Sequence, residues 1–437
     1  MSRQQQGVLP RGGLGRRLAG GALTTFALKL GGTGLAFLLQ VSVARALGGP
    51  ERFGTYALAL AWANVLVLLG KRGLDTASLR FLPELRGPSA LGRRIAYKRA
   101  SRRWVLGSSC ALSALFALVV LALGAQLSAE LRLALLTAGC CVPVLGSLQL
   151  GSSWLQADRR MLASQGPLLC LVPGLALLGV LLLFGPLGQE ATPTRALLLY
   201  GGSAALALLV SRGLAGREQA KPSPVEPEAL RQWRSVASSM LLTSGFGLVL
   251  AQADILMLGM LADPAGAGEY AAVSRLARLL SFPLLAVNAV VAPMISELYH
   301  SGRREELQRL LEQAVMGVVL ISAPLLLAIG LRGDLVLALF GEEYTAGLPA
   351  LRILLIGHTC NVLAGSVGFL LNMTGGHRTA ARILGCSAAL NIALNGILIP
   401  HLGTQGAALA TATTTIAWNV SMYVAVRRRD GLRPSFF

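Results

Sequence analysis

Apolar runs of about 18 or more residues recur along the whole chain, and short polar segments separate them. Each run is long enough to cross the hydrocarbon core of a bilayer. Backbone polar groups must find partners within such a segment, so we predict helices. The pattern predicts an all-α membrane protein with twelve spans, at about 21–46, 54–71, 104–127, 131–152, 163–185, 194–211, 235–261, 270–294, 311–331, 347–371, 379–399 and 405–426.

One motif occurs twice in the chain. LGGPERFGTYALAL, residues 47–60, aligns with LADPAGAGEYAAVS, residues 261–274, at a shift of 214 residues. PELR at 83–86 and SELY at 296–299 follow at nearly the same shift. We therefore predict a duplicated protein with six spans in each half.

An even number of spans starts both halves on the same side of the membrane. The two lobes should then be related by a pseudo-two-fold axis along the membrane normal, with the substrate path between them. The predicted divisions are an N-terminal six-helix lobe (1–215), a cytoplasmic linker (216–234) and a C-terminal six-helix lobe (235–437). KPSPVEPE, residues 221–228, favours the linker because its alternate prolines forbid a regular helix.

Basic residues are distributed unequally between the two sides of the membrane. With a cytoplasmic N-terminus, 30 of the 39 Lys and Arg residues fall on the cytoplasmic side and five on the other. This pattern predicts that both termini are cytoplasmic, and it explains the net charge of +19 without a nucleic-acid partner. Residues 78–103 form a strongly basic segment, predicted as either a short helix on anionic headgroups or a solvated loop.

Sequence motifs of enzymes are not found. Gly70-Lys71, the one Gly-Lys pair, lacks the upstream glycine of a phosphate-binding loop. The predicted outward loops have only about ten residues, too few for an extramembrane catalytic domain. We therefore expect no enzymatic activity, no bound cofactor and no metal centre, and a proton or sodium gradient stays open as an energy source.

Ionisable residues inside spans are the best candidates for function, because each costs at least about 2.5–3.5 kcal/mol unless it faces water or a partner. They are Lys29, Asp254, Arg275, Arg278 and Arg352. Lys29, Arg275 and Arg278 belong to helices expected to line a cavity between the lobes, where they would attract an anion such as phosphate. The alternative is snorkelling toward the headgroups, which we favour for Arg352.

Asp254 is the candidate ion-coupling residue, and it occupies the repeat position of Gln40. It could bind a proton or a sodium ion, or pair with Lys29 or Arg275, and we favour the pairing. Asn64 and Asn288 are candidate substrate contacts within spans, although hydrogen bonding between helices is the commoner role of such amides.

Several motifs, in this order along the chain, resemble those of one family. LGGPERFGTYALA (47–59), GLDTASLRFLPE (73–84), LFGEEYTAGLPALRIL (339–354) and IPHLGTQGAALAT (399–411) look like segments of Wzx-type polysaccharide and O-antigen flippases. These flippases share a superfamily with multidrug extruders and the lipid II flippase. The lipid II flippase has two further C-terminal helices, whereas this sequence ends soon after Arg427-Arg428-Arg429, so we do not expect it to belong to that subgroup.

The resemblance implies a flippase of the bacterial inner membrane. It would move undecaprenyl-diphosphate-linked oligosaccharides to the periplasmic leaflet by alternating access, for a surface polysaccharide such as the O-antigen of lipopolysaccharide. A polysaccharide polymerase and a chain-length regulator are the implied partners. The residues that would meet the diphosphate or an acidic sugar are Lys29, Arg275, Arg278, Asn64 and Asn288.

The alternative function is a multidrug extruder that exchanges small molecules for protons or sodium ions, with Asp254 as the coupling site. Such a protein is expected to carry more acidic residues in its lobes. The charges inside the predicted spans are mainly positive, which favours an anionic substrate.

Overall fold

The computed structural model describes residues 11–87, 90–216, 223–224, 226–433 and 435, and its regular secondary structure there is helical. The helices of the N-terminal half are α1 (Arg11–Leu47), α2 (Pro50–Lys71), α3 (Leu74–Glu84), α4 (Leu91–Ala122), α5 (Ala129–Ala157), α6 (Met161–Gly166), the π-helical η2 (Pro167–Leu171), α7 (Val172–Phe184) and α8 (Pro193–Ala215). Those of the C-terminal half are α9 (Pro227–Leu261), α10 (Pro264–Leu279), α11 (Phe282–His300), α12 (Arg304–Leu337), the 3₁₀ helix η3 (Glu342–Gly347), α13 (Leu348–Ala364), α14 (Val367–Met373) and α15 (His377–Asp430).

The number of membrane spans agrees with the sequence prediction. Among the described residues, ten segments are long and apolar enough to cross a membrane, and the bent pair α10–α11 makes eleven. The 54 residues of α15 are interrupted at Gly403, whose φ of 53° and ψ of −128° are not helical. A straight helix of that length would be about 80 Å long, against a hydrocarbon core of about 30 Å. The two arms of α15 are therefore separate spans, which gives the predicted twelve.

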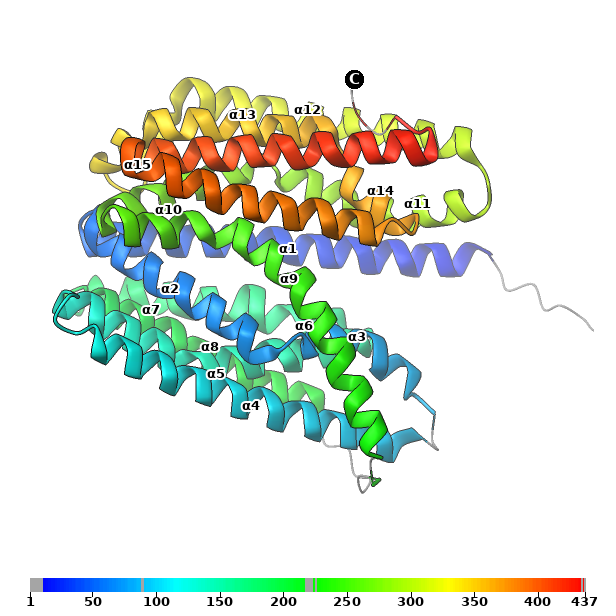
Figure 1. Ribbon diagram of the computed structural model, residues 1–437, viewed down its shortest axis with the longest axis horizontal. Coiled ribbons are helices and arrows are strands. Elements are labelled where there is room, and N and C mark those ends of the chain that lie inside the picture. Colours follow the sequence, from blue (N-terminus) through cyan, green and yellow to red (C-terminus); the bar gives the residue numbers. More distant parts are fainter. Residues whose placement is uncertain (1–10, 88–89, 217–222, 225, 434, 436–437) are drawn as a thin grey trace, which may run out of the picture.

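The helices form two lobes, one above the other in Figure 1. The N lobe, α1–α8, is held together by packing of α5 against α2, α4 and α8. In the C lobe, α9–α15, the long helix α15 packs against α9, α13 and α14. The start of α1 and the C-terminus lie at the same end of the molecule, as an even number of crossings requires (Figure 1).

The duplicated motif is located where the two lobes meet. Each copy forms a turn followed by a helix that begins with proline, at Pro50 in α2 and Pro264 in α10. The two helices cross at Gly54 and Gly268, where a Cβ added to either glycine would overlap the backbone of the other helix. Only glycine permits such a close approach. We call this contact the glycine crossing.

Aromatic side chains close the same end of the molecule. Phe53 of α2 packs against Phe340 and Tyr344, with ring centroids 6.3 and 6.0 Å apart. Phe37 of α1 meets the edge of Phe340 at 5.7 Å. The Nε of Arg45 also donates a hydrogen bond to the carbonyl oxygen of Leu339, at 2.7 Å. The N lobe is thus in direct contact with the C lobe at the end that carries the motif turns.

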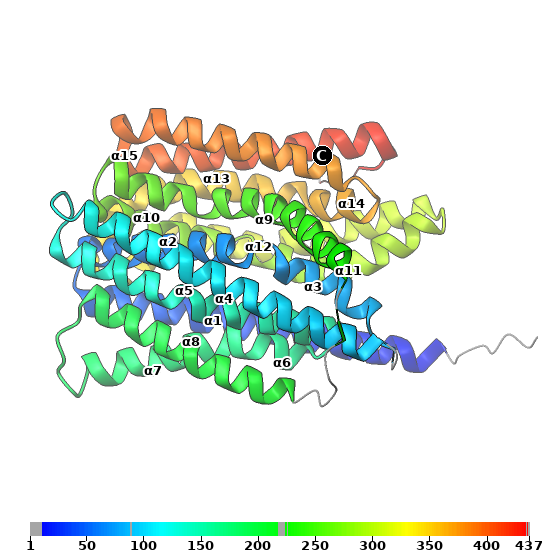
Figure 2. The ribbon, with the colours of Figure 1, turned by 60° about the horizontal axis from the view of Figure 1, so that its bottom comes forward.

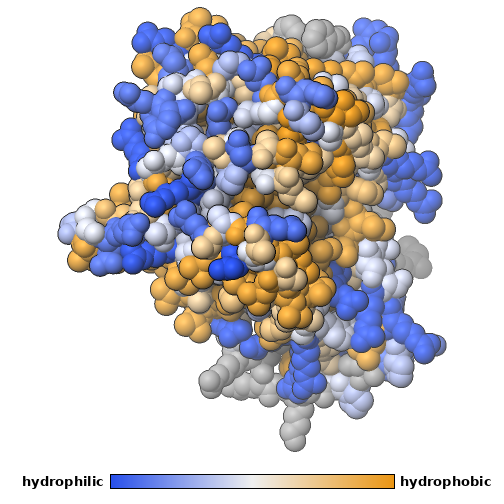
Figure 3. Space-filling view, turned by 60° about the vertical axis from the view of Figure 1, so that its left-hand side comes forward, coloured by the Kyte–Doolittle hydropathy of each residue, from blue (hydrophilic) through white to orange (hydrophobic). Residues whose placement is uncertain are grey.

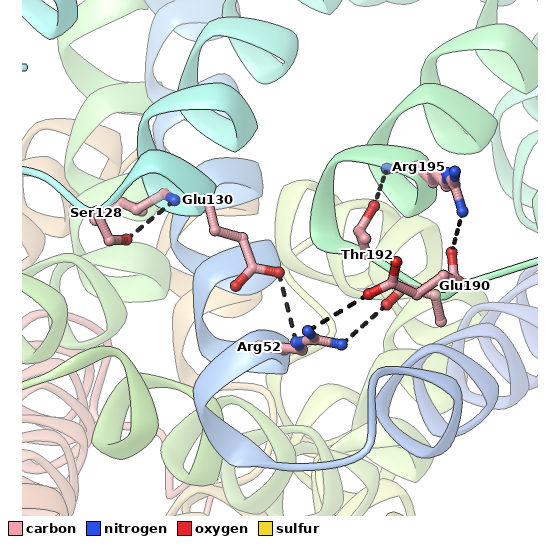
Figure 4. Close-up of polar contacts among 8 residues, drawn as sticks. Arg52, Ser128, Glu130, Glu190, Thr192 and Arg195 are labelled. Carbon is pink, nitrogen blue, oxygen red and sulfur yellow. Dashed lines mark hydrogen bonds and ion pairs between the residues drawn. The ribbon is translucent and has the colours of Figure 1, made fainter.

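A polar network joins three helices of the N lobe at this end (Figure 4). Arg52, at the start of α2, lies 3.6 Å from Glu130 of α5 and 3.7 Å from Glu190. Glu190 precedes α8 and accepts a hydrogen bond from Arg195 through its carbonyl oxygen. These pairs are exposed, so each contributes little energy on its own, but together they position the start of α2.

At the opposite end, α9 leaves the C lobe and packs on the N lobe (Figure 1). Its Trp233 is buried and meets the ring of Tyr97 edge-on, with centroids 4.9 Å apart. A Cβ on Gly73 would overlap the carbonyl oxygen of Ala237 in α9. The described part of the basic segment 78–103 therefore forms parts of α3 and α4 that pack against α9, so the prediction of a solvated loop was wrong. In addition, α9 begins at Pro227, inside the range predicted as linker.

The outer surface agrees with a multi-pass membrane protein. Large apolar side chains such as Leu118, Leu209 and Leu331 are more than half exposed. Figure 3 shows apolar side chains over the body of the molecule and hydrophilic ones gathered toward its edges. Such a surface is stable in contact with lipid rather than water.

The glycine crossing predicts a strong effect of one added methyl group. In Gly54→Ala, the new Cβ must push α2 away from α10, and overpacking of this kind costs roughly 1–3 kcal/mol. The matched control is Gly34→Ala, because Gly34 of α1 has open space around it. We expect a lower melting temperature in detergent for Gly54→Ala only. Equal melting of the two variants would contradict the crossing.

Candidate functional site

A cavity of about 480 Å³ lies between the two lobes. Its lining comes from α1, α2, η2, α7 and α8 of the N lobe and from α9, α10 and α11 of the C lobe. Residues of α2 and α10 that follow the glycine crossing, among them Ala61 and Arg275, lie in this lining. The crossing therefore forms the closed end of the cavity.

Two arginines of α10 give the cavity its charge. Arg275 and Arg278 are three residues apart, which places them on the same face of the helix, and both line the cavity. Arg278 donates two hydrogen bonds to Ser274, at 3.1 Å, while the buried Nε of Arg275 has no hydrogen-bond partner in the described structure. Neither arginine forms an ion pair with a described carboxylate. Guanidinium groups without an ion-pair partner are suited to binding an anion.

Asp254 is buried beside the cavity, within the C lobe, and neutral donors surround it. The hydroxyl of Tyr270 and the amide of Asn395 each donate a hydrogen bond to its carboxylate at 2.6 Å, and the hydroxyl of Thr411 donates a third. The favoured ion pair with Lys29 or Arg275 was wrong. Three hydrogen bonds from neutral groups stabilise the carboxylate in place of a cation.

Further oxygen atoms lie next to Asp254. The amide of Asn395 also donates to the side-chain oxygen of Asn391 at 3.1 Å, and its own oxygen is buried without a partner in the described structure. Asn391 in turn donates to the hydroxyl of Thr414. Carboxylate, amide and hydroxyl oxygens are the ligands that hard cations prefer. We call Asp254, Asn391, Asn395 and Thr411 the Asp254 cluster.

The duplication relates this cluster to a residue of the N lobe. Gln40 is the repeat counterpart of Asp254, and Tyr56 is that of Tyr270. Gln40 lines the cavity and is only 4% exposed, and its side-chain oxygen has no described hydrogen-bond partner. The two lobes thus differ at one equivalent position, which is neutral in the N lobe and a carboxylate in the C lobe.

The other predicted site residues are dispersed. Asn64 lines the cavity, and its role as a substrate contact stays a prediction. Lys29 is exposed on α1, outside the cavity lining but one turn before Gly32, which belongs to it. Asn288 is buried elsewhere and accepts a hydrogen bond from Ser366 at 2.5 Å. This contact is the interhelical role that is common for an amide within a span.

Sequence reasoning missed four polar side chains of the cavity. Thr33, Gln40, Tyr200 and Gln252 line it together with the arginines. Gln40 carried a signal, because it aligns with Asp254 in the repeat. Tyr200 and Gln252 lie well inside α8 and α9, and a single tyrosine or glutamine within a span does not reveal which face of the helix it occupies.

A two-lobed bundle with a polar cavity between its halves defines a class of membrane transporters. Within that class, the chain belongs to the polysaccharide biosynthesis protein family, whose model matches residues 18–299. The model of the MatE family matches residues 239–397. The family resemblance deduced from the motifs is confirmed.

Two relatives are similar in sequence. The probable low-salt glycan biosynthesis flippase Agl15 of Haloferax volcanii is 25% identical, over 94% of this chain and 85% of that protein. The uncharacterized membrane protein MJ1068 of Methanocaldococcus jannaschii is 32% identical over 135 residues, which are 30% of this chain. That match spans 26% of MJ1068.

Two solved structures share the fold at low sequence identity. The lipid II flippase MurJ in an inward closed conformation has a TM-score of 0.74 at 14% identity, covering 93% of this chain and 87% of MurJ. A multidrug resistance MATE family transporter of the MOP superfamily, in an inward-facing conformation, has a TM-score of 0.71 at 15% identity. The match covers 92% of this chain and 98% of the MATE transporter chain.

Proposed function

We propose that the chain is a flippase that moves a lipid-linked oligosaccharide across the membrane by alternating access. The observation that carries this proposal is the pair of unpaired arginines, Arg275 and Arg278, in the cavity between the lobes. A diphosphate between glycan and lipid is an anion of the kind that guanidinium groups bind. The family match and the glycan flippase relative support a substrate of this class.

The proposed carrier is undecaprenyl diphosphate and the proposed location is the bacterial inner membrane, with both termini in the cytoplasm. These details rest on the motif resemblance and on the 30 cytoplasmic Lys and Arg residues. Movement across the membrane makes and breaks no covalent bond, so no catalytic residue is required. A polysaccharide polymerase and a chain-length regulator are proposed partners that use the translocated units, for example in O-antigen synthesis.

The contacts between the lobes support alternating access. The glycine crossing and the aromatic contacts of Phe53 close the motif end of the cavity, which is the outward end in the proposed orientation. An oligosaccharide bound at Arg275 could leave on that side only after α2 and α10 separate. The lobes would therefore exchange this closed end for contacts on the cytoplasmic side.

The alternative function is a multidrug extruder. The match of residues 239–397 to the MatE family is the observation that favours it. A cationic drug would be repelled by Arg275 and Arg278, because both line the cavity and neither forms an ion pair with a described carboxylate. The anionic substrate is therefore the better match to this cavity.

Deletion of the gene tests the proposed function in the cell. We expect lipid-linked repeat units to accumulate in the cytoplasmic leaflet and the surface polysaccharide to be lost. The measurement is extraction and mass spectrometry of the lipid-linked glycans, with gene complementation as the control. Normal polysaccharide together with increased sensitivity to cationic dyes would support the extruder instead.

The role of the arginine pair predicts a selective loss in Arg275→Ala. Without one charge-assisted contact to the diphosphate, we expect a reduction in complementation of about tenfold or more. Arg352→Ala is the matched control, since Arg352 is an exposed cation of α13 outside the cavity lining. Both variants should insert normally into the membrane, as measured by protein level in purified membranes. Full activity of Arg275→Ala would contradict an anion site at α10.

We propose that the Asp254 cluster couples transport to a sodium or proton gradient. A buried carboxylate beside the unpartnered oxygen of Asn395 supports this proposal. Because Asp254 contacts Tyr270 on α10, the helix that also carries both arginines, occupancy of the cluster could bias the position of those arginines. This arrangement would link ion binding to substrate binding.

Sodium binding at the cluster has a direct readout. Sodium ions should raise the melting temperature of the wild-type protein relative to equal potassium, because a ligand of the folded state stabilises it. In Asp254→Asn, sodium should no longer raise the melting temperature above its value in potassium, even if the substitution itself changes that value. Asp334→Asn is the control, since Asp334 is exposed on α12. A sodium increment that persists in Asp254→Asn would exclude the cluster as the binding site.

A further inference from the structure

A second polar crevice lies on the N lobe, apart from the cavity between the lobes. It is formed by α4, α5 and α8, which neighbour one another on this lobe, with α5 in contact with both other helices (Figure 2). The crevice has a volume of about 60 Å³, and none of its lining residues also lines the cavity. Small residues of α5, Ser147 and Gly151, belong to its lining.

Two arginines from different helices flank this crevice. Arg102 comes from α4 and Arg212 from the end of α8, and both are exposed. Neither forms an ion pair or a side-chain hydrogen bond within the described part of the chain. They are close enough for their charges to repel each other. Two like charges held together without a carboxylate are stabilised by a bound anion.

Hydrogen-bond donors without described partners line the same crevice. The indole N–H of Trp154, in the lining of the crevice, is buried and has no acceptor among the described residues. The hydroxyl of Ser211 also lines the crevice and forms no hydrogen bond there. A buried donor left unpaired costs about 1–3 kcal/mol, so an acceptor in the crevice would remove this cost.

The described carboxylate at the end of α5 is already paired. Asp158, one turn beyond Trp154, binds Arg94 at 2.5 Å and lies 4.0 Å from Lys98. Lys98 also lies 5.8 Å from the centroid of the Trp154 ring. The described surroundings of the crevice therefore carry an excess of positive charge.

The position of the crevice along its helices corresponds to the membrane surface. On α8, Leu206 and Leu209 are 53% and 62% exposed, and Arg212 follows one turn later. On α4, no charged residue occurs from Val105 to Ala122, immediately after the basic stretch that contains Arg102. Tryptophan is favoured at the same level, between apolar lipid and water. The crevice thus lies where lipid headgroups are.

We propose that this crevice binds the phosphate of an anionic membrane lipid. Arg102 and Arg212 would neutralise the phosphate and the N–H of Trp154 would donate a hydrogen bond to it. Free phosphate offers the same chemistry, but the exposed leucines beside Arg212 supply a surface for acyl chains, which favours the lipid. The proposal is independent of the transported substrate.

Native mass spectrometry of the delipidated full-length protein tests it. Titration with phosphatidylglycerol should reveal one site, which the double variant Arg102→Gln/Arg212→Gln weakens about tenfold or more. Trp154→Phe, which keeps an aromatic ring but removes the N–H, should weaken the site several-fold. The control Arg103→Gln/Arg231→Gln removes the same charge from exposed arginines outside the crevice and should bind as the wild type does.

Two results would overturn the proposal. One is that the Arg102→Gln/Arg212→Gln variant binds phosphatidylglycerol as tightly as the Arg103→Gln/Arg231→Gln control does. Melting temperatures would show that both variants are folded. The other is binding of inorganic phosphate at these arginines without retention of phosphatidylglycerol, which would assign the crevice to a soluble anion. Weaker retention of phosphatidylcholine, whose headgroup carries a compensating cation, would agree with recognition of net negative charge.

Discussion

The contact between Gly54 and Gly268 determines how the rest of this structure is arranged. Because neither residue has a side chain, the backbones of α2 and α10 touch, and the duplicated halves meet at equivalent points. Arg275 follows Gly268 by seven residues, two helical turns, and so lies on the same face of α10. The face of α10 that contacts α2 at one end of the molecule therefore also forms part of the cavity wall.

The charge of the cavity follows from the way in which Asp254 is held. Tyr270, Asn395 and Thr411 satisfy this carboxylate with neutral hydrogen bonds. Arg275 and Arg278 line the cavity and form no ion pair with this or any other described carboxylate. One helix, α10, carries Tyr270 and both arginines, which connects the carboxylate to the cavity without a salt bridge.

The sequence predicted the architecture better than the contacts. Hydrophobic runs and the repeat at a shift of 214 residues were sufficient for twelve helices in two halves, since both signals follow from the bilayer and from duplication. The partners of Asp254 come from positions 16, 141 and 157 residues away, and no local pattern indicates such contacts. The contact of the basic segment 78–103 with Trp233 was not predicted, because Trp233 lies in another lobe.

The central claim is that this cavity carries an anionic lipid-linked glycan, and movement in a purified system measures it most directly. The protein would be reconstituted into liposomes that contain undecaprenyl-diphosphate-linked oligosaccharide with a fluorescent sugar, and a membrane-impermeant quencher would report the exposed leaflet. The account predicts protein-dependent exchange of the labelled glycan between leaflets. Transport of a cationic dye by the same liposomes, with the glycan remaining in its original leaflet, would contradict it.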